Sequence, residues 1–207
     1  MTALVIVAST SSPPTSGAAS VLEYVERHRT LYIVRQLLWT VPSVFLMVVF
    51  LALAVALRFR SRGLAAAGGL VAVTSWAVSL AWPTTGDGSL AMVLLADRYA
   101  DVSTAVDRAP FVAGAELLIA LNDVPAVIGV LQTLGILLIS LLMLRGPFAS
   151  GVAWLGVATG ATGVIAEVLR PVLGGAYAIY GVLLFGWLAW IAGALWRHAA
   201  AVAPDHP

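Results

Sequence analysis

The stretch Gly156-Val-Ala-Thr-Gly160-Ala-Thr-Gly163-Val-Ile-Ala-Glu167-Val-Leu-Arg170 is almost wholly apolar, yet it carries a glutamate and an arginine. Its glycines and its two charged residues are spaced four, three, four and three positions apart, which places them on one face of an α-helix. Small residues at this spacing allow two helix backbones to approach closely in lipid. We therefore expect a membrane-spanning helix whose glycine face, formed by Gly156, Gly160 and Gly163, packs against a second helix and directs Glu167 into the interior of a bundle.

The composition of the whole chain also predicts a membrane protein. Its 207 residues are 61% hydrophobic and only 10% charged, whereas a soluble domain usually carries about 25% charged residues. So few polar side chains could not cover a soluble surface, and the length suits one bundle with about five spans of roughly 20 apolar residues each. We expect an all-α fold, namely a polytopic transmembrane helical bundle. Its expected partner is the lipid bilayer that surrounds it.

Several classes of function are excluded by the same composition. The formal net charge is +1, so there is no broad basic field for binding nucleic acid. Cysteine is absent and all eleven basic residues are arginine, which excludes thiolate chemistry and the Schiff-base lysine that holds retinal. The predicted spans contain no histidine, which argues against a haem held by two intramembrane histidines. We expect neither a metal site nor another cofactor.

Five apolar segments are expected to cross the membrane, and each is bounded by charged residues, proline or glycine. They cover residues 34–57, 64–82, 124–144, 151–169 and 173–196. Pro42 lies inside the first segment and predicts a kink, because proline removes one backbone hydrogen bond of a helix. Asp123 precedes the third segment and is a candidate N-cap for it.

Amphipathic helices are expected between and before the spans, where charged residues alternate with apolar ones. They cover residues 20–33, 89–107 and 110–122, and Pro110 is expected to occupy the first position of the last one. Residues 1–19 are rich in Ser, Thr, Pro and Gly, which is typical of a disordered tail, and residues 199–207 form a short polar tail. Residues 20–198 are then a single transmembrane helical domain.

The distribution of arginine predicts the orientation of the chain. Residues 58–63 hold three arginines and no acid, whereas the basic residues of the opposite side lie in longer segments that also hold acids. Short basic loops favour the cytoplasmic side of a membrane. We expect the N-terminus outside and the C-terminus inside. The bias toward Ala, Val, Leu, Gly and Arg suggests a GC-rich bacterial genome, and hence the bacterial cytoplasmic (inner) membrane.

A five-span topology places several polar residues at the extracytoplasmic end of the bundle. They are Arg35, Gln36, Glu116, Asp123, Glu167 and Arg170. An ionisable group inside a span normally finds a partner or a cavity. Two interpretations of Glu167 are therefore open: an ion pair with Arg170, three positions later on the same helix, or a ligand or proton site.

Other residues could also contact a ligand. Gln132 lies between Gly129 and Gly135 in the third predicted span, where an amide forms either an interhelical hydrogen bond or a ligand contact. Tyr177 and Tyr180 either belong to the aromatic belt of a membrane protein or line an apolar pocket.

The second half of the chain carries a series of features in a defined order. These are Asp97-Arg-Tyr-Ala-Asp101, Ala113-Gly-Ala-Glu-Leu-Leu118, Gly129-Val-Leu-Gln-Thr-Leu-Gly135, Trp154-Leu-Gly156 and Trp187-Leu-Ala-Trp190-Ile-Ala-Gly193. With this order, residues 97–197 resemble a large, functionally uncharacterised family of small bacterial multi-helix membrane proteins, of the domain-of-unknown-function type. The resemblance implies a multi-helix membrane fold and implies no mechanism.

The hypothesis that fits these features best is a non-enzymatic membrane protein. It would use the polar cluster to bind a lipid, an isoprenoid or another hydrophobic small molecule, or a partner membrane protein, because an apolar pocket with few convergent polar groups suits such ligands.

Two alternatives belong to other classes. An intramembrane enzyme, such as an acid-initiated isoprenoid cyclase, would use a carboxylate in an apolar pocket as its proton donor. Its candidate acids are Glu167, Asp123 and Glu116. A small-solute or proton-coupled transporter would need a polar path through several spans, and the predicted spans are nearly all apolar.

Overall fold

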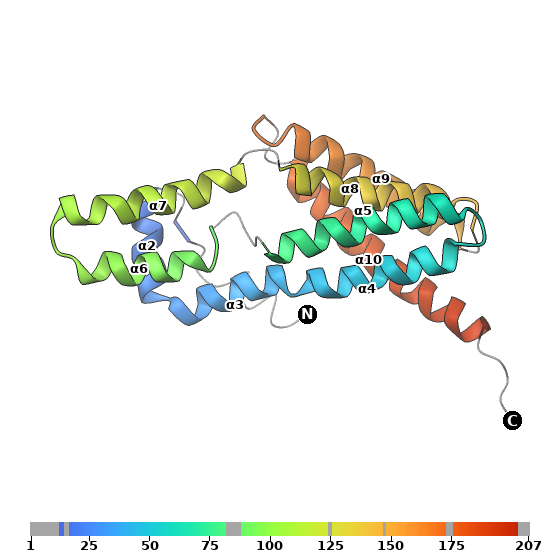
Figure 1. The fold of residues 1–207 in the computed structure, drawn as a ribbon, viewed down its shortest axis with the longest axis horizontal. Coiled ribbons are helices and arrows are strands. Elements are labelled where there is room, and N and C mark those ends of the chain that lie inside the picture. Colours follow the sequence, from blue (N-terminus) through green and yellow to red (C-terminus); the bar gives the residue numbers. More distant parts are fainter. Residues whose placement is uncertain are drawn as a thin grey trace, which may run out of the picture. The chain divides into compact units, whose positions relative to one another are not determined.

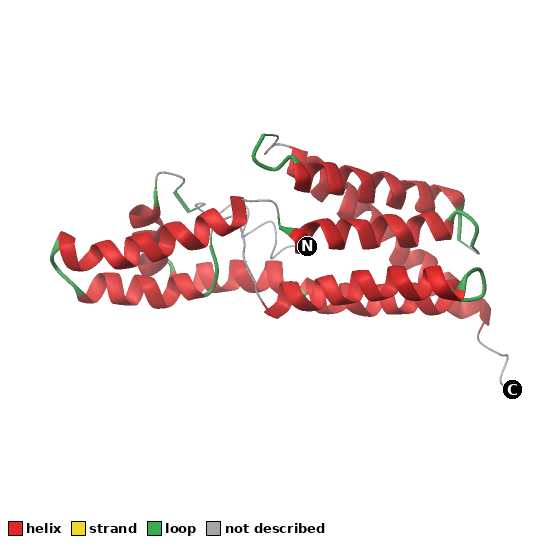
Figure 2. Cartoon of the chain, turned by 45° about the horizontal axis from the view of Figure 1, so that its top comes forward, coloured by secondary structure: helices red, strands yellow, loops and turns green. Residues whose placement is uncertain are grey.

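The computed structural model describes residues 13–14, 17–81, 88–123, 126–146, 148–172 and 176–202. Within these residues the regular elements are helices (Figures 1 and 2), so the predicted all-α fold is confirmed. The helices are α2 (Ala18–Arg27), α3 (Arg29–Thr40), α4 (Pro42–Leu57), α5 (Arg62–Ala81), α6 (Ala91–Asp101), α7 (Ala105–Asp123), α8 (Val127–Met143), α9 (Ser150–Val168) and α10 (Ala176–Val202).

The chain divides into two compact units. Unit 1 comprises Met1–Ser43 and Ser79–Val124, and unit 2 comprises Val44–Val78 and Pro125–Pro207. Unit 1 therefore contains α2, α3, α6 and α7, whereas unit 2 contains α8, α9, α10 and most of α4 and α5. The single transmembrane domain expected over residues 20–198 stays a prediction, and its residues are shared between the two units.

Four helical segments are long and apolar enough to cross a membrane. They are Arg29–Leu57, Arg62–Ala81, Ser150–Val168 and Tyr177–Arg197. The fifth predicted span corresponds to α8, which has only 17 residues. It is shorter than expected because its helix begins at Val127, two positions after Pro125, and ends at Met143, before the turn at Leu144. Four helices, fewer than the expected five, thus have both the length and the hydropathy that crossing a membrane requires.

Large apolar side chains cover the outside of these helices. Phe45 is 67% exposed, Leu70 69% and Val182 74%. Soluble monomers rarely expose contiguous apolar patches of more than a few hundred Å². The length, hydropathy and apolar surface of these helices are those of a multi-pass membrane protein.

The first span is interrupted at the proline, as its sequence predicts. Helix α3 ends at Thr40 and α4 begins at Pro42. Proline is favoured at the first position of a helix, where its missing N–H is not needed. The amphipathic helix expected over residues 20–33 is likewise divided, because α2 ends at Arg27 and α3 begins at Arg29.

The boundary between α6 and α7 differs from the prediction. The sequence pattern indicates helices over residues 89–107 and 110–122, but the break lies at residues 102–104 and Pro110 stands inside α7. Thr104 explains the difference, because its Oγ1 accepts a hydrogen bond from the Asp107 N–H at 3.2 Å and donates one to Asp107 Oδ2 at 2.6 Å. This pairing caps the N-terminus of α7.

The end of α10 also differs. Its backbone remains helical to Val202, although a tail is expected from residue 199. Three consecutive alanines, at 199–201, extend the helix, since alanine has the highest helix propensity. The remaining tail residues, 203–207, and residues 1–12 and 15–16 of the expected N-terminal tail lie outside the described residues.

Unit 1 is held by a small apolar core between α2, α6 and α7 (Figure 1). Leu22 of α2 and Met92 of α6 are fully buried in it, as is Ala115 of α7. Tyr32 of α3 is also fully buried, and its hydroxyl donates a hydrogen bond to the Ser89 carbonyl at 3.1 Å. This core places α6 beside α7.

Unit 2 is packed through the glycine face of α9. A Cβ atom added to Gly160 would lie 2.6 Å from the backbone nitrogen of Leu137 in α8. Gly163 lies against Thr133 of α8 and Tyr180 of α10. The absence of side chains on this face therefore allows α9 to contact both neighbouring helices at close range.

Gly160→Ala is expected to lower the free energy of unfolding by about 1–3 kcal/mol, because the new methyl group meets α8 backbone and forces the helices apart. The measurement is unfolding of the purified protein in mixed micelles of increasing dodecyl sulfate content. Gly186→Ala in α10 is the matched control, since nothing lies within 4 Å of its added Cβ. Equal stability of the two variants would contradict the packing role of the glycine face.

Candidate functional site

The carboxylate of Glu167 connects three helices of unit 2. Glu167 stands in the last turn of α9 and is fully buried. Its Oε1 accepts a hydrogen bond from the Ala126 N–H at 3.1 Å, at the start of α8. Its Oε2 accepts hydrogen bonds from Arg170 Nη2 at 2.8 Å and from the Tyr177 hydroxyl at 2.6 Å. We call these four residues the Glu167 junction.

Two features of α8 accommodate this carboxylate. Gly129 lies in its first turn, and the Glu167 carboxylate occupies the space that a Cβ would need. The N-cap residue of α8 is Ala126, which has no side-chain oxygen to accept a hydrogen bond. Glu167, from a different helix, accepts the N–H of Ala126 itself, and its negative charge lies near the positive end of the α8 dipole. The expected N-cap, Asp123, instead ends α7.

Arg170 is held on both sides within the junction. Its guanidinium contacts Glu167, and its Cζ lies 4.4 Å from the ring centroid of Tyr177. The Tyr180 ring stands edge-on to the Tyr177 ring, with 5.6 Å between the centroids. The side chain of Arg170 is only 17% exposed. A cation between a carboxylate and an aromatic face is well stabilised where water is scarce.

The geometry of the junction favours the structural interpretation of Glu167. Both of its carboxylate oxygens have donors, and the side chain has no exposed surface. A ligand would therefore have to displace Arg170, Tyr177 or the start of α8. The arrangement is suited to joining helices rather than to proton donation or ligand capture.

Three other buried polar side chains of unit 2 are hydrogen-bonded within their own helices. The hydroxyls of Ser75, Thr133 and Thr159 each donate a hydrogen bond to a backbone carbonyl of the same helix. Gln132 Nε2, like Ser140 Oγ in the same helix, is buried without a hydrogen-bond partner among the described residues.

The remaining predicted site residues belong to unit 1. Arg35 and Gln36 lie in α3, where Gln36 is buried. Glu116 lies on an exposed position of α7, and the side chain of Asp123 lies outside the described residues. Since Glu167 and Arg170 belong to unit 2, the expected single cluster of six polar residues stays a prediction.

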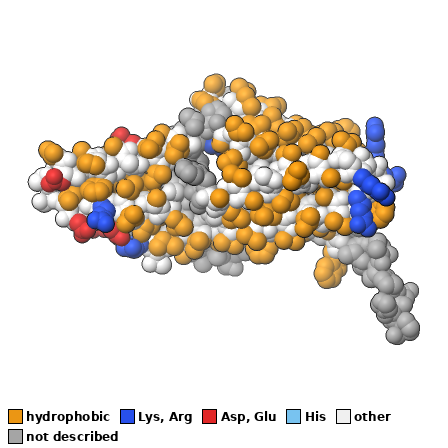
Figure 3. Space-filling model, in the orientation of Figure 1, with side chains coloured by type: hydrophobic (Ala, Val, Ile, Leu, Met, Phe, Trp, Pro, Cys, Tyr) orange, Lys and Arg blue, Asp and Glu red, His pale blue; other side chains and the backbone are white. Residues whose placement is uncertain are grey.

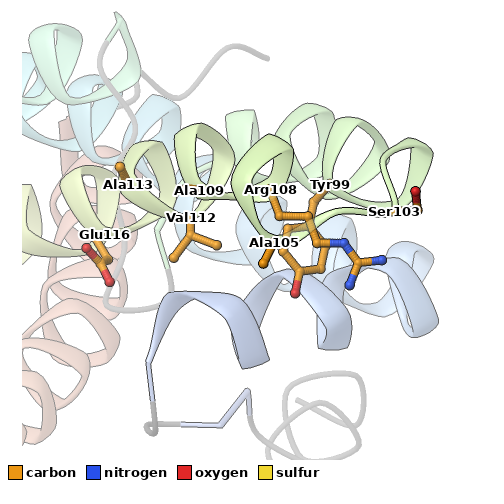
Figure 4. Close-up of a pocket in the computed structure, with 8 residues that line it drawn as sticks. All are labelled: Tyr99, Ser103, Ala105, Arg108, Ala109, Val112, Ala113 and Glu116. Carbon is orange, nitrogen blue, oxygen red and sulfur yellow. The ribbon is translucent and has the colours of Figure 1, made fainter.

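Unit 1 contains a groove along α7 with a volume of about 470 Å³. Its polar lining residues are Tyr99, Ser103, Arg108 and Glu116. Its apolar lining residues are Ala105, Ala109, Val112 and Ala113. We call this feature the α6–α7 groove. Figure 4 shows Tyr99, Ser103 and Arg108 at one end and Glu116 at the other, with the apolar residues between them.

Arg108 is held in a defined position at its end of the groove. Its Nε donates a hydrogen bond to the Val102 carbonyl at 2.9 Å, and its Cζ lies 4.7 Å from the Tyr99 ring centroid. Neither contact uses the two Nη groups. These groups match the geometry of a carboxylate or a phosphate.

The α6–α7 groove includes one predicted site residue, Glu116, and several that the sequence analysis missed. Arg108 precedes Glu116 by eight positions, which corresponds to about 12 Å along a helix. The spacing of Ala109, Val112, Ala113 and Glu116 by three, one and three positions is the only local signal for a shared face. Among the described residues no group of three or more His, Cys, Asp or Glu could hold a metal ion.

No family model, curated protein or solved structure matches this chain. The resemblance of residues 97–197 to an uncharacterised membrane-protein family therefore stays a prediction.

Tyr177→Phe is expected to lower the free energy of unfolding by about 2 kcal/mol, because it removes a hydrogen bond to a buried charged group. Tyr180→Phe is the matched control one turn later in α10, since no hydrogen bond from its hydroxyl to Glu167 is present. Unfolding of both variants in mixed micelles of dodecyl sulfate and neutral detergent measures the difference in their free energies of unfolding. A loss of the same size in both variants would show that the junction does not depend on this hydroxyl.

Proposed function

We propose that this multi-pass membrane protein binds a lipid-like small molecule, with an apolar chain and an acidic group, in the α6–α7 groove. The observation that carries the proposal is the position of Arg108, whose guanidinium is fixed by Val102 and Tyr99 at one end of an apolar strip. The strip consists of Ala109, Val112 and Ala113.

The dimensions of the groove support a small amphiphile. A volume of about 470 Å³ lies within the range of about 300–1,000 Å³ that is usual for small-molecule sites. An acidic head group would be bound by the Nη groups of Arg108 and by the Ser103 hydroxyl, while the chain would cover the alanine and valine side chains. Glu116, at the far end, would favour a hydroxyl or an amine over a second acid.

The proposed topology has five spans, with α8 as the third. Its 17 residues extend about 26 Å, close to the hydrocarbon thickness of about 30 Å. Helix α2 packs against α6 and α7, which supports placing these segments on one side of the membrane, with α4 and α5 between them in the chain. We propose that this side is extracytoplasmic, that the C-terminus is cytoplasmic and that the membrane is the bacterial inner membrane.

The enzyme and transporter alternatives have less support. A cyclase acid must reach its substrate, but Glu167 is fully buried and bonded to three donors. Glu116 is exposed and therefore lacks the apolar surroundings that such an acid needs. A transporter needs polar groups directed toward a path, whereas the buried hydroxyls of Ser75, Thr133 and Thr159 are bonded to their own helices.

Arg108→Gln is expected to weaken binding of a fluorescent long-chain fatty acid by about tenfold or more, because a hydrogen bond to a charged group contributes about 1.5–3 kcal/mol. Fluorescence titration of the purified protein in neutral detergent measures the affinity. Arg98→Gln is the control, because Arg98 is an exposed arginine of α6 that is not part of the groove lining. The corresponding fatty alcohol should bind both variants equally.

A second pair of variants tests the apolar strip. Ala113→Trp should block the groove and abolish binding of the acid and of the alcohol, whereas Ala100→Trp, at an exposed position of α6, should bind as the unsubstituted protein does. Unchanged fatty-acid binding by both Arg108→Gln and Ala113→Trp would show that the proposal is wrong.

A further inference from the structure

One end of unit 2 is strongly basic. Arg58, Arg60 and Arg62 lie at the connection between α4 and α5, and Arg145 lies in the turn after α8. The two segments are adjacent, because a Cβ atom added to Gly146 would lie 2.8 Å from Leu57 Cδ2. We call the four arginines the arginine cap. Figure 3 shows basic side chains gathered at the end of unit 2 where α4 turns into α5.

The charge of the arginine cap is not neutralised by the described part of the protein. All four side chains belong to exposed residues. The ion pairs found among the described residues involve Arg27, Arg29 and Arg170 and none of these four. Four like charges close together repel one another and attract anions from the surroundings.

Phe59 indicates which kind of anion fits this surface. Its side chain is 81% exposed, and the Cζ of Arg58 lies 4.7 Å from its ring centroid. Water is an unfavourable solvent for an aromatic ring, and a soluble phosphate would offer the ring no apolar surface to contact. Aromatic side chains next to basic residues are instead typical of the boundary between lipid headgroups and acyl chains.

The position of the cap in the chain agrees with that boundary. Helix α4 ends at Leu57 and α5 begins at Arg62, and both belong to segments long and apolar enough to cross a membrane. The connection between them is only four residues long, at positions 58–61. It therefore cannot extend far beyond the headgroup region in which the two spans end.

We propose that the arginine cap binds anionic phospholipid headgroups, with Phe59 inserted at the edge of the acyl chains. Each guanidinium can bind a phosphate through two parallel hydrogen bonds. Clusters of basic residues next to a span attract anionic lipids in this way. The proposal is independent of the α6–α7 groove, because it concerns different residues and a different unit.

The test uses the full chain in neutral detergent, titrated with phosphatidylglycerol or with phosphatidylcholine of the same acyl chains. Native mass spectrometry measures the apparent affinity for each lipid. We expect phosphatidylglycerol to bind at least a hundredfold more tightly, because each of the four arginines contributes about fivefold. The variant Arg58→Gln/Arg60→Gln/Arg62→Gln should lose about fivefold in phosphatidylglycerol affinity for each arginine removed and should bind phosphatidylcholine unchanged.

Two control variants separate this effect from general charge and from acyl-chain contact. Arg27→Gln/Arg29→Gln/Arg98→Gln removes the same charge from unit 1 and should keep the preference for phosphatidylglycerol. Phe59→Ser should weaken both lipids by a similar factor and also keep the preference.

Three results would overturn the proposal. The first is equal binding of the two lipids by the unsubstituted protein. The second is an equal loss of preference in the two triple variants, which would indicate a general charge effect. The third is displacement of phosphatidylglycerol by water-soluble glycerol phosphate at similar concentration, which would identify a site for a soluble anion. Fatty-acid binding in the groove is measured separately and remains interpretable in each case.

Discussion

A carboxylate inside a membrane-spanning bundle must obtain its hydrogen bonds from the protein, because hydrocarbon offers none. Glu167 meets this requirement with donors from three places: the start of α8, the turn after α9 and the first turn of α10. Each donor fixes one element relative to the other two. The glycine face of α9 provides the steric complement, since it brings the backbone of α8 close enough for the Ala126 N–H to reach Oε1.

Charged residues have two different roles in this chain. In the Glu167 junction the charges are buried and paired, so they contribute to the arrangement of the helices. Arg108 and Glu116 of unit 1, and the arginine cap of unit 2, make no ion pair with described residues. These charges are therefore available to molecules outside the protein. The proposed amphiphile in the groove and the proposed anionic headgroups at the cap are both of lipid-like chemistry.

The sequence predicts those features that depend on helical periodicity. The regular spacing of Gly156, Gly160 and Gly163 indicates a packed face, and the same spacing indicates that Glu167 lies inside the bundle. Pro42 also marks a helix boundary in the sequence, because proline lacks the N–H that the interior of a helix needs. The length of α8 is harder to predict, because Ala126 and Leu144, the residues immediately outside its two ends, are also apolar.

The missed features depend on partners that are distant in the sequence or on a cap. Ala126 gives no sign that its N–H binds a carboxylate 41 positions later. Thr104 moves the start of α7 through a single side chain, and the apolar pattern around it is uninformative. The α6–α7 groove forms only when the two helices pack side by side, so Arg108 and Tyr99 resemble ordinary residues of a solvated surface until then.

The discontinuity of unit 1 has a consequence for the order of folding during synthesis. Helix α2 packs against α6 and α7, but α4 and α5 lie between them in the chain. Chains emerge from the ribosome with the N-terminus first. The apolar surface of α2 is therefore without its final partners while α4 and α5 are synthesised. Unit 1 can close only after α7 has been synthesised, so its apolar core forms after α4 and α5 have been made.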